Sequence, residues 1–589
     1  MNNIFKNVAP SSAQLHQLSE HLLVPFSTKK LPSARIVWMN RNWMRMRGMN
    51  LSSPSVRAEL SSWLLSEYAV SSNVAEVGKD EVEASTAFYA DRYGASEGCL
   101  HGGSGRCGIN GMFNAKGIGR TPLVSPGVDW SHSHGLLTLC DAIREAIASE
   151  ILSREMPHGV IPVVAIIDTG LDLPMGQGEF PARCAILIRP NFLRVAHFER
   201  SIYFGTRGFE GSDQWADEHR VREMYLSIER AYSKESIDAE RALVETFTRI
   251  VSQVGHSQAH RIWNGRPGSD SFAIDGSFLD FGNFRALPDW RCADDGNGQI
   301  FGRDLVELIK LSDSLGHYLS KHCGSGSIRP LISPQAIKGD LKAAFIHGCL
   351  VGIGLPSSSQ PAIAMAGAIY DAFCAQQRIR HRLDMAPESL INTAARGSFR
   401  NYIGLISAPF IDDVVEDLSD FARRDSWRHS CVTDLKDAIS AQLGRWLEPR
   451  EDLFYMNSKL ATQSKIKEAM AADNPEYLLT DFIARKVTLG RRVWPDLSSN
   501  KVPVGYSLTR DSELRCYFDL REGGFISTLT GDISTRQLKW FGAGQNDRLE
   551  DGSFQIRTAS CPIPVKSPAQ TMSHKIFFEA AEAVGKFNA

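Results

Sequence analysis

The sequence has almost no excess of charge of either sign. Its 589 residues include 65 basic and 67 acidic side chains, a net charge of −2. Proteins that bind nucleic acid or anionic membranes usually carry a basic surplus, so the charge balance favours neither partner. The chain also lacks an apolar run of about 18 residues, the length of a membrane-spanning helix, and its start, MNNIFKNVAPSSAQ, lacks the apolar core of a secretion signal. We therefore expect a cytoplasmic protein.

Paired metal ligands are also missing from the sequence. The 11 cysteines are scattered and form no CxxC pair, so we expect reduced thiols, mostly in the core. His256 and His260 have the i, i+4 spacing of helical metal sites. The segment HSQAH lacks the glutamate of an HExxH motif, and we interpret this histidine pair as structural.

Hydrophobic periodicity predicts a mixed α and β protein with four regions. An N-terminal extension, residues 1–85, contains a helix over 56–70. Residues 86–175 combine strands with a helix over 141–156 and a buried strand over 160–170, and residues 176–480 are mainly helical, with a break at Pro356–Pro361. From residue 486 the segments VTLGRRVWPDL, VPVGYSLTR and LRCYFDLREGGFISTLTG alternate and turn like strands, so residues 481–589 are expected to form a β-rich module.

A glycine-rich stretch, residues 98–122, is the first candidate for a binding site. Gly103 and Gly105 lie in a glycine cluster that ends at Arg106, and Lys116 follows after a short apolar run. A glycine-rich turn, a strand and then a lysine is the arrangement by which a kinase-type lobe covers ATP. The spacing is not that of GxxxxGK[ST], which argues against a P-loop. Taken alone the stretch indicates little, because glycine-rich loops are more often plain turns.

The following segments add charged residues suited to phosphate. Glu145, on the helix over 141–156, could hold Lys116 as a kinase glutamate holds its strand lysine; Glu150 is the alternative partner. Arg189 and Arg194 lie near the end of an apolar strand, where two guanidinium groups suit bidentate phosphate binding.

These motifs, in this order, resemble the selenoprotein O (SelO) family of pseudokinase-fold protein adenylyltransferases. The resemblance lies in KGIGRTP, AIREAIASE and IRPNFLRVAHFE, with support from the opening segment LPSARIVWMNRNWMRMRGMNL. The family also has an aspartate-asparagine pair and, ten residues after its aspartate, a metal-binding aspartate; Asp270 and Asp280 have that spacing. The resemblance implies an α+β, bilobal, protein-kinase-like fold with a small lobe at 86–175 and a mainly helical large lobe at 176–480.

The resemblance also implies a role for each matching residue. ATP would bind in a flipped orientation, with its α-phosphate toward the acceptor. Asp280 would bind Mg²⁺ together with the residue at position 271, Asp270 would be the general base, and Glu145 would orient Lys116. The residues that would hold ATP are Gly103, Gly105, Arg106, Lys116, Gly135, Glu145, Arg189 and Arg194.

The sequence departs from the family pattern at three places. Ser271 replaces the asparagine that completes the metal site, and a hydroxyl is a weaker ligand for Mg²⁺. His134 precedes Gly135 where relatives have aspartate, which changes the charge near the nucleotide. Many relatives end in a redox-active selenocysteine or cysteine, whereas the last cysteine here is Cys561. The first two departures bear on activity, and the third bears on redox regulation.

Four functions are compatible with these residues. The leading hypothesis is transfer of AMP from Mg-ATP to a hydroxyl of a protein or peptide. A second is adenylation of a peptide carboxylate, as in the maturation of a microcin-type peptide, with the β-rich module binding the peptide. A third is phosphoryl transfer, and the fourth is a catalytically inactive pseudokinase that binds nucleotide and a partner protein.

Overall fold

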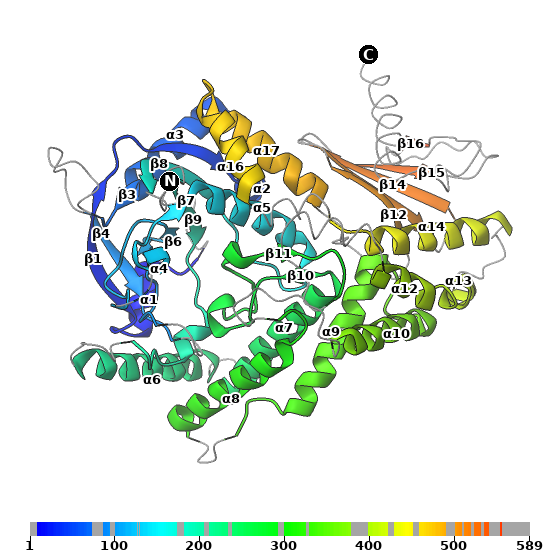
Figure 1. Ribbon diagram of the computed structural model, residues 1–589, viewed down its shortest axis with the longest axis horizontal. Coiled ribbons are helices and arrows are strands. Elements are labelled where there is room, and N and C mark those ends of the chain that lie inside the picture. The colour runs from blue at the N-terminus through cyan, green and yellow to red at the C-terminus, as the bar shows by residue number, and fades with distance from the viewer. Residues whose placement is uncertain are drawn as a thin grey trace.

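The protein has a mixed α+β fold in a computed structural model (Figure 1). The structure describes residues 9–73, 86–94, 100–126, 128, 130–173, 182–204, 211–233, 238–291, 300–324, 329–377, 398–421, 429–450, 459–490, 501–508, 512–519, 524–531, 535–540 and 554–555. Cys561 lies outside these residues. Within these ranges, no helix combines the length and the apolar character needed to cross a membrane.

The N-terminal half is built on a nine-stranded antiparallel sheet, seen at the left of Figure 1. Its strands are β1 (Leu23–Lys30), β2 (Arg35–Met39), β3 (Val70–Ser71), β4 (Thr86–Asp91), β5 (Cys107–Asn110), β6 (Phe113–Lys116), β7 (Leu137–Thr138), β8 (Ala165–Leu173) and β9 (Ala182–Pro190). The order is β2-β8-β9-β6-β5-β4-β1-β3, with β7 paired to β9. The sequence boundaries at 85 and 175 thus fall inside the region that builds one sheet.

The first sheet has apolar residues on both of its faces, so other elements pack on each face. The strands β8 and β9 carry runs of buried aliphatic residues, as expected for strands covered on both sides. The predicted strand over 160–170 begins only at Ala165, after Pro162, and ends at Leu173. Three more helices, α1 (Ser12–Leu18), α2 (Arg41–Arg45) and α3 (Pro54–Tyr68), belong to the N-terminal region; side chains of α2 and α3 pack on one face of the sheet.

The helix α5 (Leu139–Glu155) covers the other face, and it confirms the helix predicted over 141–156. The hydroxyl of Thr138 accepts a hydrogen bond from the backbone N–H of Asp141, which caps the helix. Thirteen of its residues are buried, including Glu145. A charged side chain in such a place needs a partner.

The middle of the chain is helical, as predicted. The helices are α6 (Gly211–Ser233), α7 (Ala239–Ala259), α8 (Asp304–Cys323), α9 (Pro334–Ile353), α10 (Gln360–Gln377), α12 (Ser398–Ser407), α13 (Phe410–Phe421), α14 (His429–Leu447), α16 (Lys459–Met470) and α17 (Pro475–Gly490); α4 (Trp130–Ser133) precedes α5. The predicted break at 356–361 lies between α9 and α10 except for Gln360 and Pro361, which form the start of α10. Short pieces between α7 and α8 include β10 (Ile262–Trp263) and β11 (Arg285–Ala286), which pair with each other.

The helices α16 and α17 return to the first sheet and pack on α5 and β2 (Figure 1). Just before them, Arg450 forms a buried ion pair with Glu155 at the end of α5, with 2.8 Å between Nη1 and Oε2. The C-terminal helices therefore hold the helix that carries Glu145.

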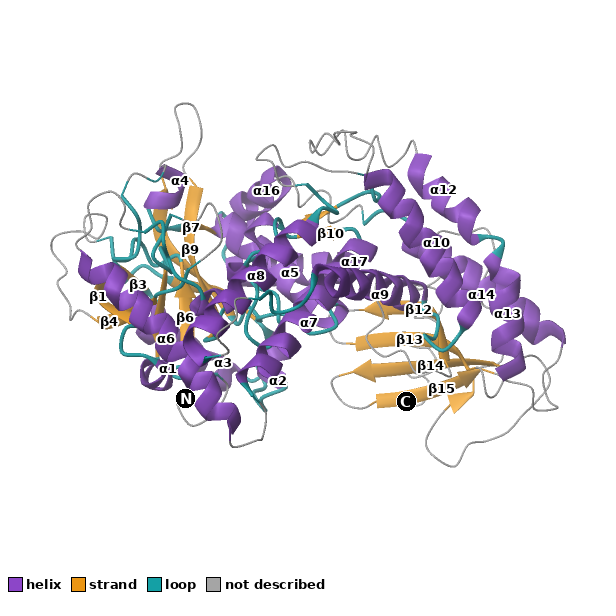
Figure 2. Cartoon of the chain, turned by 90° about the horizontal axis from the view of Figure 1, so that it is seen from below, coloured by secondary structure: helices purple, strands orange, loops and turns teal. Residues whose placement is uncertain are grey.

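A second, five-stranded sheet follows α17, as predicted for the C-terminal region (Figure 2). Its strands are β12 (Lys501–Leu508), β13 (Ser512–Asp519), β14 (Gly524–Gly531), β15 (Thr535–Trp540) and β16 (Phe554–Gln555). The prediction was wrong for Val487–Gly490, which form the last turn of α17. Leu479, Ile483 and Val487 are buried at the i, i+4 spacing of a helix. The rest of that segment, 491–497, lies outside the described residues.

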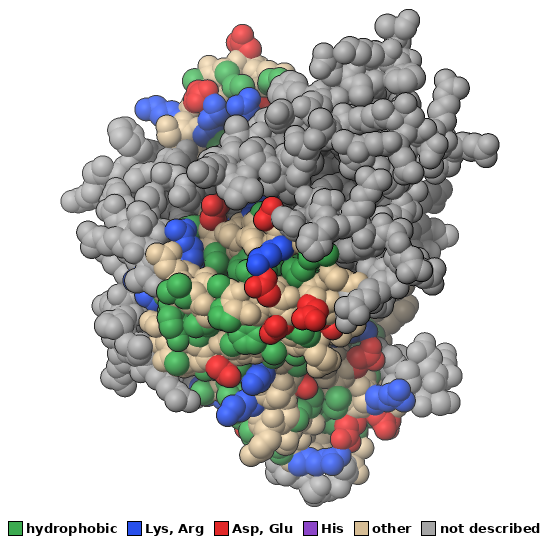
Figure 3. Space-filling view, turned by 90° about the vertical axis from the view of Figure 1, so that its right-hand side faces the viewer, with side chains coloured by type: hydrophobic (Ala, Val, Ile, Leu, Met, Phe, Trp, Pro, Cys, Tyr) green, Lys and Arg blue, Asp and Glu red, His purple; other side chains and the backbone are tan. Residues whose placement is uncertain are grey.

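On the described part of the face in Figure 3, acidic and basic side chains are interspersed among hydrophobic ones. This mixture agrees with the balanced charge of the sequence.

Candidate active site

Strand register places four polar side chains on one face of the first sheet. Asn114 of β6 lies opposite Arg189 of β9, and Cys107 of β5 lies opposite Lys116 of β6. Because side chains alternate along a strand, Lys116 and Asn114 share a face. Arg189 donates to Oδ1 of Asn114 at 3.2 Å, and its Nη2 lies 3.8 Å from Sγ of Cys107.

Glu145 reaches this face from α5. Its Oε1 lies 2.6 Å from Nζ of Lys116, and both side chains are almost fully buried. The alternative partner Glu150 is excluded, because its carboxylate accepts hydrogen bonds from the side chains of Asn40 and Asn42 at 2.5 and 3.2 Å. The sequence motif thus identified the correct glutamate for the lysine.

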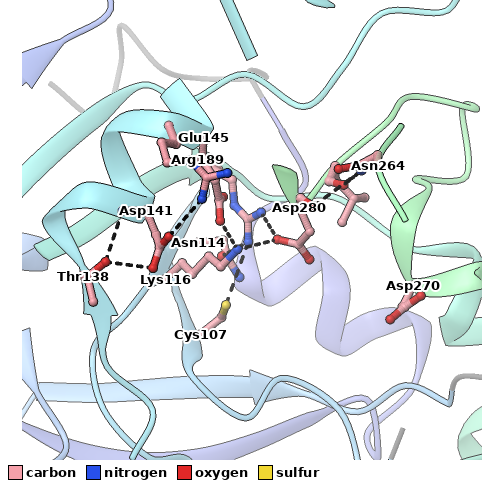
Figure 4. A network of polar contacts seen from close by, with 12 residues as sticks. Cys107, Asn114, Lys116, Thr138, Asp141, Glu145, Arg189, Asn264, Asp270 and Asp280 are labelled. Atoms are coloured by element: carbon pink, nitrogen blue, oxygen red, sulfur yellow. Dashed lines mark hydrogen bonds and ion pairs between the residues drawn. The ribbon is translucent and has the colours of Figure 1, made fainter. Parts of the chain in front are cut away.

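Asp280 joins this group from a distant part of the chain (Figure 4). Its Oδ1 lies 2.9 Å from Nζ of Lys116 and 2.7 Å from Nη1 of Arg189, and its Oδ2 lies 2.7 Å from Nη1 of Arg194. Burial favours the neutral acid, but the positive charges of Arg194, Lys116 and Arg189 outweigh it and hold the pKa of Asp280 well below its usual range. Its side chain is 30% exposed, whereas those of the three cations are 2–3% exposed.

The backbone of Asp280 is strained. Its φ is +58° and its ψ is 70°, which is a left-handed conformation that residues other than glycine rarely adopt. Strain of this kind is tolerated where the surroundings fix the residue, and it concentrates at functional sites. Here the three ion pairs supply the fixing contacts.

Arg194 is positioned by residues that the sequence analysis did not single out. Its backbone N–H donates to Nδ1 of His197 at 2.7 Å, and Nε2 of His197 contacts a carboxylate oxygen of Asp91 at 3.1 Å. Burial opposes ionisation of Asp91, but the hydrogen bond from His197 and the charge of Arg194 lower its pKa to about 2. The Arg194 guanidinium also lies 4.9 Å from the ring centre of Tyr93. The segment IRPNFLRVAHFE contains His197, but no spacing rule links it to Asp91.

Asp270 and Ser271 lie on the neighbouring loop, in the short helical turn Ser269–Ser271. The backbone carbonyl of Asp270 accepts a hydrogen bond from Arg194. Its carboxylate lies apart from the ion-pair cluster in Figure 4. Burial, together with the charge of Asp280, raises the pKa of Asp270 although Arg194 is near. The backbone carbonyl of Ser271 accepts from the N–H of Leu279 at 3.1 Å, which ties this loop to the strained residue Asp280.

The glycine-rich residues are close-packed. A Cβ on Gly103 would lie 2.1 Å from the carbonyl oxygen of Asp91, and one on Gly135 would lie 2.2 Å from the carbonyl carbon of Gly119. A Cβ on Gly105 would lie 3.2 Å from a methyl group of Val124. Close approach of neighbouring backbone, rather than a ligand, is therefore sufficient to require glycine at Gly103 and Gly135.

Among the predicted cations, Arg106 is the one that the structure does not bring into the cluster. Its backbone carbonyl accepts from Gly117, beside Lys116. Its side chain is exposed and has no hydrogen bond or ion pair with any residue that the structure describes.

The histidines are consistent with structural roles. The ring of His134 accepts a hydrogen bond from the N–H of Leu136 at 2.9 Å. His256 and His260 are buried with their ring centres 4.4 Å apart, and burial lowers the pKa of His256 to about 3. Over the described ranges, no three His, Cys, Asp or Glu residues gather as they do in a metal site built from protein ligands alone.

The cluster of Lys116, Glu145, Arg189, Arg194 and Asp280 has three positive and two negative charges. The net charge of the cluster is therefore positive. Its three cations are almost fully buried, and electrostatic interactions are stronger in such an environment than in water. Such a site attracts an anion that can exchange for the partly exposed carboxylate of Asp280. Phosphate fits this description, because arginine and lysine are its usual ligands.

Comparison with known proteins agrees with this geometry. Residues 87–294, about a third of the chain, match the model of the family described as protein adenylyltransferase SelO. No curated protein matches the chain. The matched segment contains every residue of the cluster and both residues of the neighbouring loop. The resemblance seen in the sequence is thereby confirmed for residues 87–294, which are similar to a family described as a protein adenylyltransferase.

Proposed function

We propose that this protein transfers AMP from Mg-ATP to a hydroxyl group of a protein or peptide. The observation that carries the proposal is the meeting of Lys116, Glu145, Arg189, Arg194 and Asp280 in one buried cluster. These residues come from two strands, a helix and two loops that are far apart in sequence. A purely structural role would not require three buried cations around a single, partly exposed carboxylate, because buried charge is costly.

The proposal includes a bilobal, kinase-like architecture. The small lobe would be the first sheet with α5, and the large lobe would be the helices from α6 onward, approximately the predicted regions 86–175 and 176–480. The N-terminal extension would complete the small lobe, because β1, β2 and β3 pair within its sheet. The β-rich module after residue 481 would be an addition to this plan. Its first strand, β12, packs on α14, and Arg450, three residues after α14, forms an ion pair with Glu155 of α5, which supports a role linked to the active site.

The cations of the cluster would bind the phosphates. Lys116, Arg189 and Arg194 have donors directed at the carboxylate of Asp280, and phosphate oxygens could replace that carboxylate on the same donors. Glu145 would keep Lys116 in place by the 2.6 Å ion pair. Gly103, Gly105, Gly135 and Arg106 would line the nucleotide on the other side. In the flipped orientation of ATP, the α-phosphate would face the loop of Asp270.

The site fits Mg²⁺, which prefers carboxylate oxygen. Asp280 is the most exposed charged member of the cluster, and its charge helps to raise the pKa of Asp270 on the neighbouring loop. Asp280 would hold the metal with Ser271, and the metal would neutralise charge on the phosphates. In the free protein the three cations already neutralise Asp280, so metal should bind well only together with ATP.

Asp270 would act as general base. It would accept the proton of the acceptor hydroxyl as the hydroxyl oxygen bonds to the α-phosphorus and the bond to pyrophosphate breaks. The raised pKa of Asp270 suits this role, since a more basic carboxylate accepts a proton more readily.

Labelled ATP tests the proposed reaction. With ATP labelled at the α-phosphate, the purified protein should transfer label to proteins of a lysate, and with label at the γ-phosphate it should not. Transfer of the γ-label instead would indicate a phosphotransferase, and ATP binding without any transfer would indicate a nucleotide-binding pseudokinase. If hydroxylamine removed the label, the product would be an acyl-adenylate on a carboxylate. Hydroxylamine cleaves the mixed anhydride of an acyl-adenylate, whereas it does not cleave the phosphodiester that AMP forms with a hydroxyl.

Replacing Arg189 by alanine should weaken ATP binding by about 10- to 150-fold, because a hydrogen bond to a charged group contributes about 1.5–3 kcal/mol. Calorimetry with a non-hydrolysable ATP analogue would measure the change. Arg183→Ala is the matched control on the same strand: it contacts Asp168, which also has Arg35 at 3.1 Å as a partner. Equal ATP affinity in the two variants would contradict the proposed phosphate site.

A further inference from the structure

A small pocket with several polar groups in a largely apolar wall lies next to the loop of Asp270. It is lined by the end of α7, the strand β10, the loop over 264–267 and the start of α8, and it has room for a water-sized occupant. Its polar lining includes Gln258, Asn264, Ser271 and Asp304, and its apolar lining includes Trp263 and Phe301.

The polar groups of this pocket present an excess of hydrogen-bond acceptors. Oε1 of Gln258 and Oδ1 of Asn264 are buried and have no hydrogen-bond donor among the described residues. The amide nitrogens of both residues are engaged: Nε2 of Gln258 donates to Asp304 at 2.6 Å, and Nδ2 of Asn264 points to the carbonyl oxygens of Leu279 and Asp280 at 3.4 and 3.5 Å. The oxygens cannot be exchanged for donors by flipping the amides without losing these bonds.

Asp304 adds a negative charge that is only weakly compensated. Its side chain accepts from the neutral amide of Gln258, the residue is 7% exposed, and burial raises the pKa of its carboxyl to about 6. Arg266 also lines the pocket, but its guanidinium lies 3.5 Å from the carboxylate of Glu307. A buried carboxylate beside two unpaired amide oxygens is unfavourable unless a donor or cation is bound.

We propose that this pocket binds a monovalent metal cation, such as K⁺ or Na⁺, through oxygen atoms of Asp304, Gln258 and Asn264. Hard cations prefer carboxylate and carbonyl oxygens, which are the groups gathered here. One carboxylate balances one positive charge, and a pocket with room for a single water-sized occupant cannot take the several water molecules that Mg²⁺ usually keeps. Ser271, which the proposed function assigns to Mg²⁺, lines the pocket but is not counted among these ligands.

The position of the pocket links the ion to the reactive segment. Asn264 contacts the backbone carbonyls of Leu279 and Asp280, and Ser271 belongs to the turn that carries Asp270. An ion bound to Asn264 would therefore help to fix the segment of Leu279 and Asp280 and the turn that carries Asp270. The binding itself does not depend on which reaction the site performs.

Thallous ion, which replaces K⁺ and scatters X-rays anomalously, is the probe for this site. Crystals of the full chain grown with Tl⁺ should show an anomalous peak between Asp304, Gln258 and Asn264. In solution, the melting temperature of the wild type should be about 2 °C higher in KCl than in choline chloride of equal ionic strength. Asp304→Asn should lose both the peak and the K⁺-dependent shift.

A second variant gives an effect of opposite sign. Gln258→Glu places another carboxylate beside Asp304, so its stability should depend more strongly on K⁺ than that of the wild type. This variant tests the proposal even if Asp304→Asn does not fold. Absence of the Tl⁺ peak, with equal K⁺ shifts in the wild type and Gln258→Glu, would show that the pocket holds only water and would overturn the proposal.

Discussion

Replacing Asp280 by alanine should lower the rate of AMP transfer by on the order of 10³-fold or more. A bound metal supplies several kcal/mol of charge stabilisation during phosphoryl-type reactions, and each 1.36 kcal/mol changes a rate tenfold. Transfer of α-labelled AMP to protein, measured under single-turnover conditions, would give the rate. Because Asp280 is the partner of three cations, its removal also frees those cations for phosphate.

The same variant should therefore bind metal-free ATP at least as tightly as the wild type does. Mn²⁺, observed by electron paramagnetic resonance, should bind the wild type only when an ATP analogue is present, and should not bind Asp280→Ala in either condition. Asp280→Asn keeps the size of the side chain without its charge and serves as the isosteric comparison. If Asp280→Ala transferred AMP at the wild-type rate, the assigned metal role would be wrong.

The sequence predicted the helices and the first members of the cluster because their signals are local. The i, i+4 pattern of α5 and the position of Glu145 on it can be read from a few neighbouring residues. Only two residues, Glu145 and Glu150, were candidates for the partner of Lys116, and both lie on this helix. Spacing from Asp270 to Asp280 was likewise visible in a single segment.

The contacts that complete the cluster could not be predicted in this way. Arg189, Arg194 and Asp280 meet through strand pairing and a left-handed residue, and neither feature has a pattern in the sequence. The Asp91–His197 contact joins residues 106 positions apart. The glycines of the loop were attributed to a ligand, but at Gly103 the neighbouring backbone already excludes a side chain. Contacts between distant segments depend on tertiary packing. The spacing of neighbouring residues in one sequence does not reveal them.

The error at Val487–Gly490 has a related cause. The residues Val487, Thr488 and Leu489 are β-branched or aliphatic, and such short runs suit a strand as well as a buried helix turn. Packing against α5 decided the outcome, because Leu479, Ile483 and Val487 form one buried stripe. In the described part of the chain, the second sheet contacts α14 through β12, and Arg450, three residues after α14, forms an ion pair with Glu155 of α5.

Replacing Asp270 by asparagine should lower the rate by about 10²- to 10⁴-fold, the usual contribution of a general base, while the affinity for the ATP analogue stays unchanged. Affinity should be preserved because Arg194 contacts the backbone carbonyl of Asp270, which the substitution keeps. Asp275→Asn is the matched control: Asp275 is an exposed carboxylate on the same segment, and its variant should transfer AMP normally.

The pH dependence of kcat/KM provides a second test of Asp270, because it reports the free enzyme. A base must be unprotonated to act, so the rate is lost as pH falls through its pKa. Burial raises the pKa of Asp270, and the acid limb should therefore lie at higher pH than the value of about 3.9 for an ordinary aspartate. In Asp270→Asn this limb should disappear from the residual activity. An unchanged rate and acid limb in Asp270→Asn would assign the proton transfer to another group.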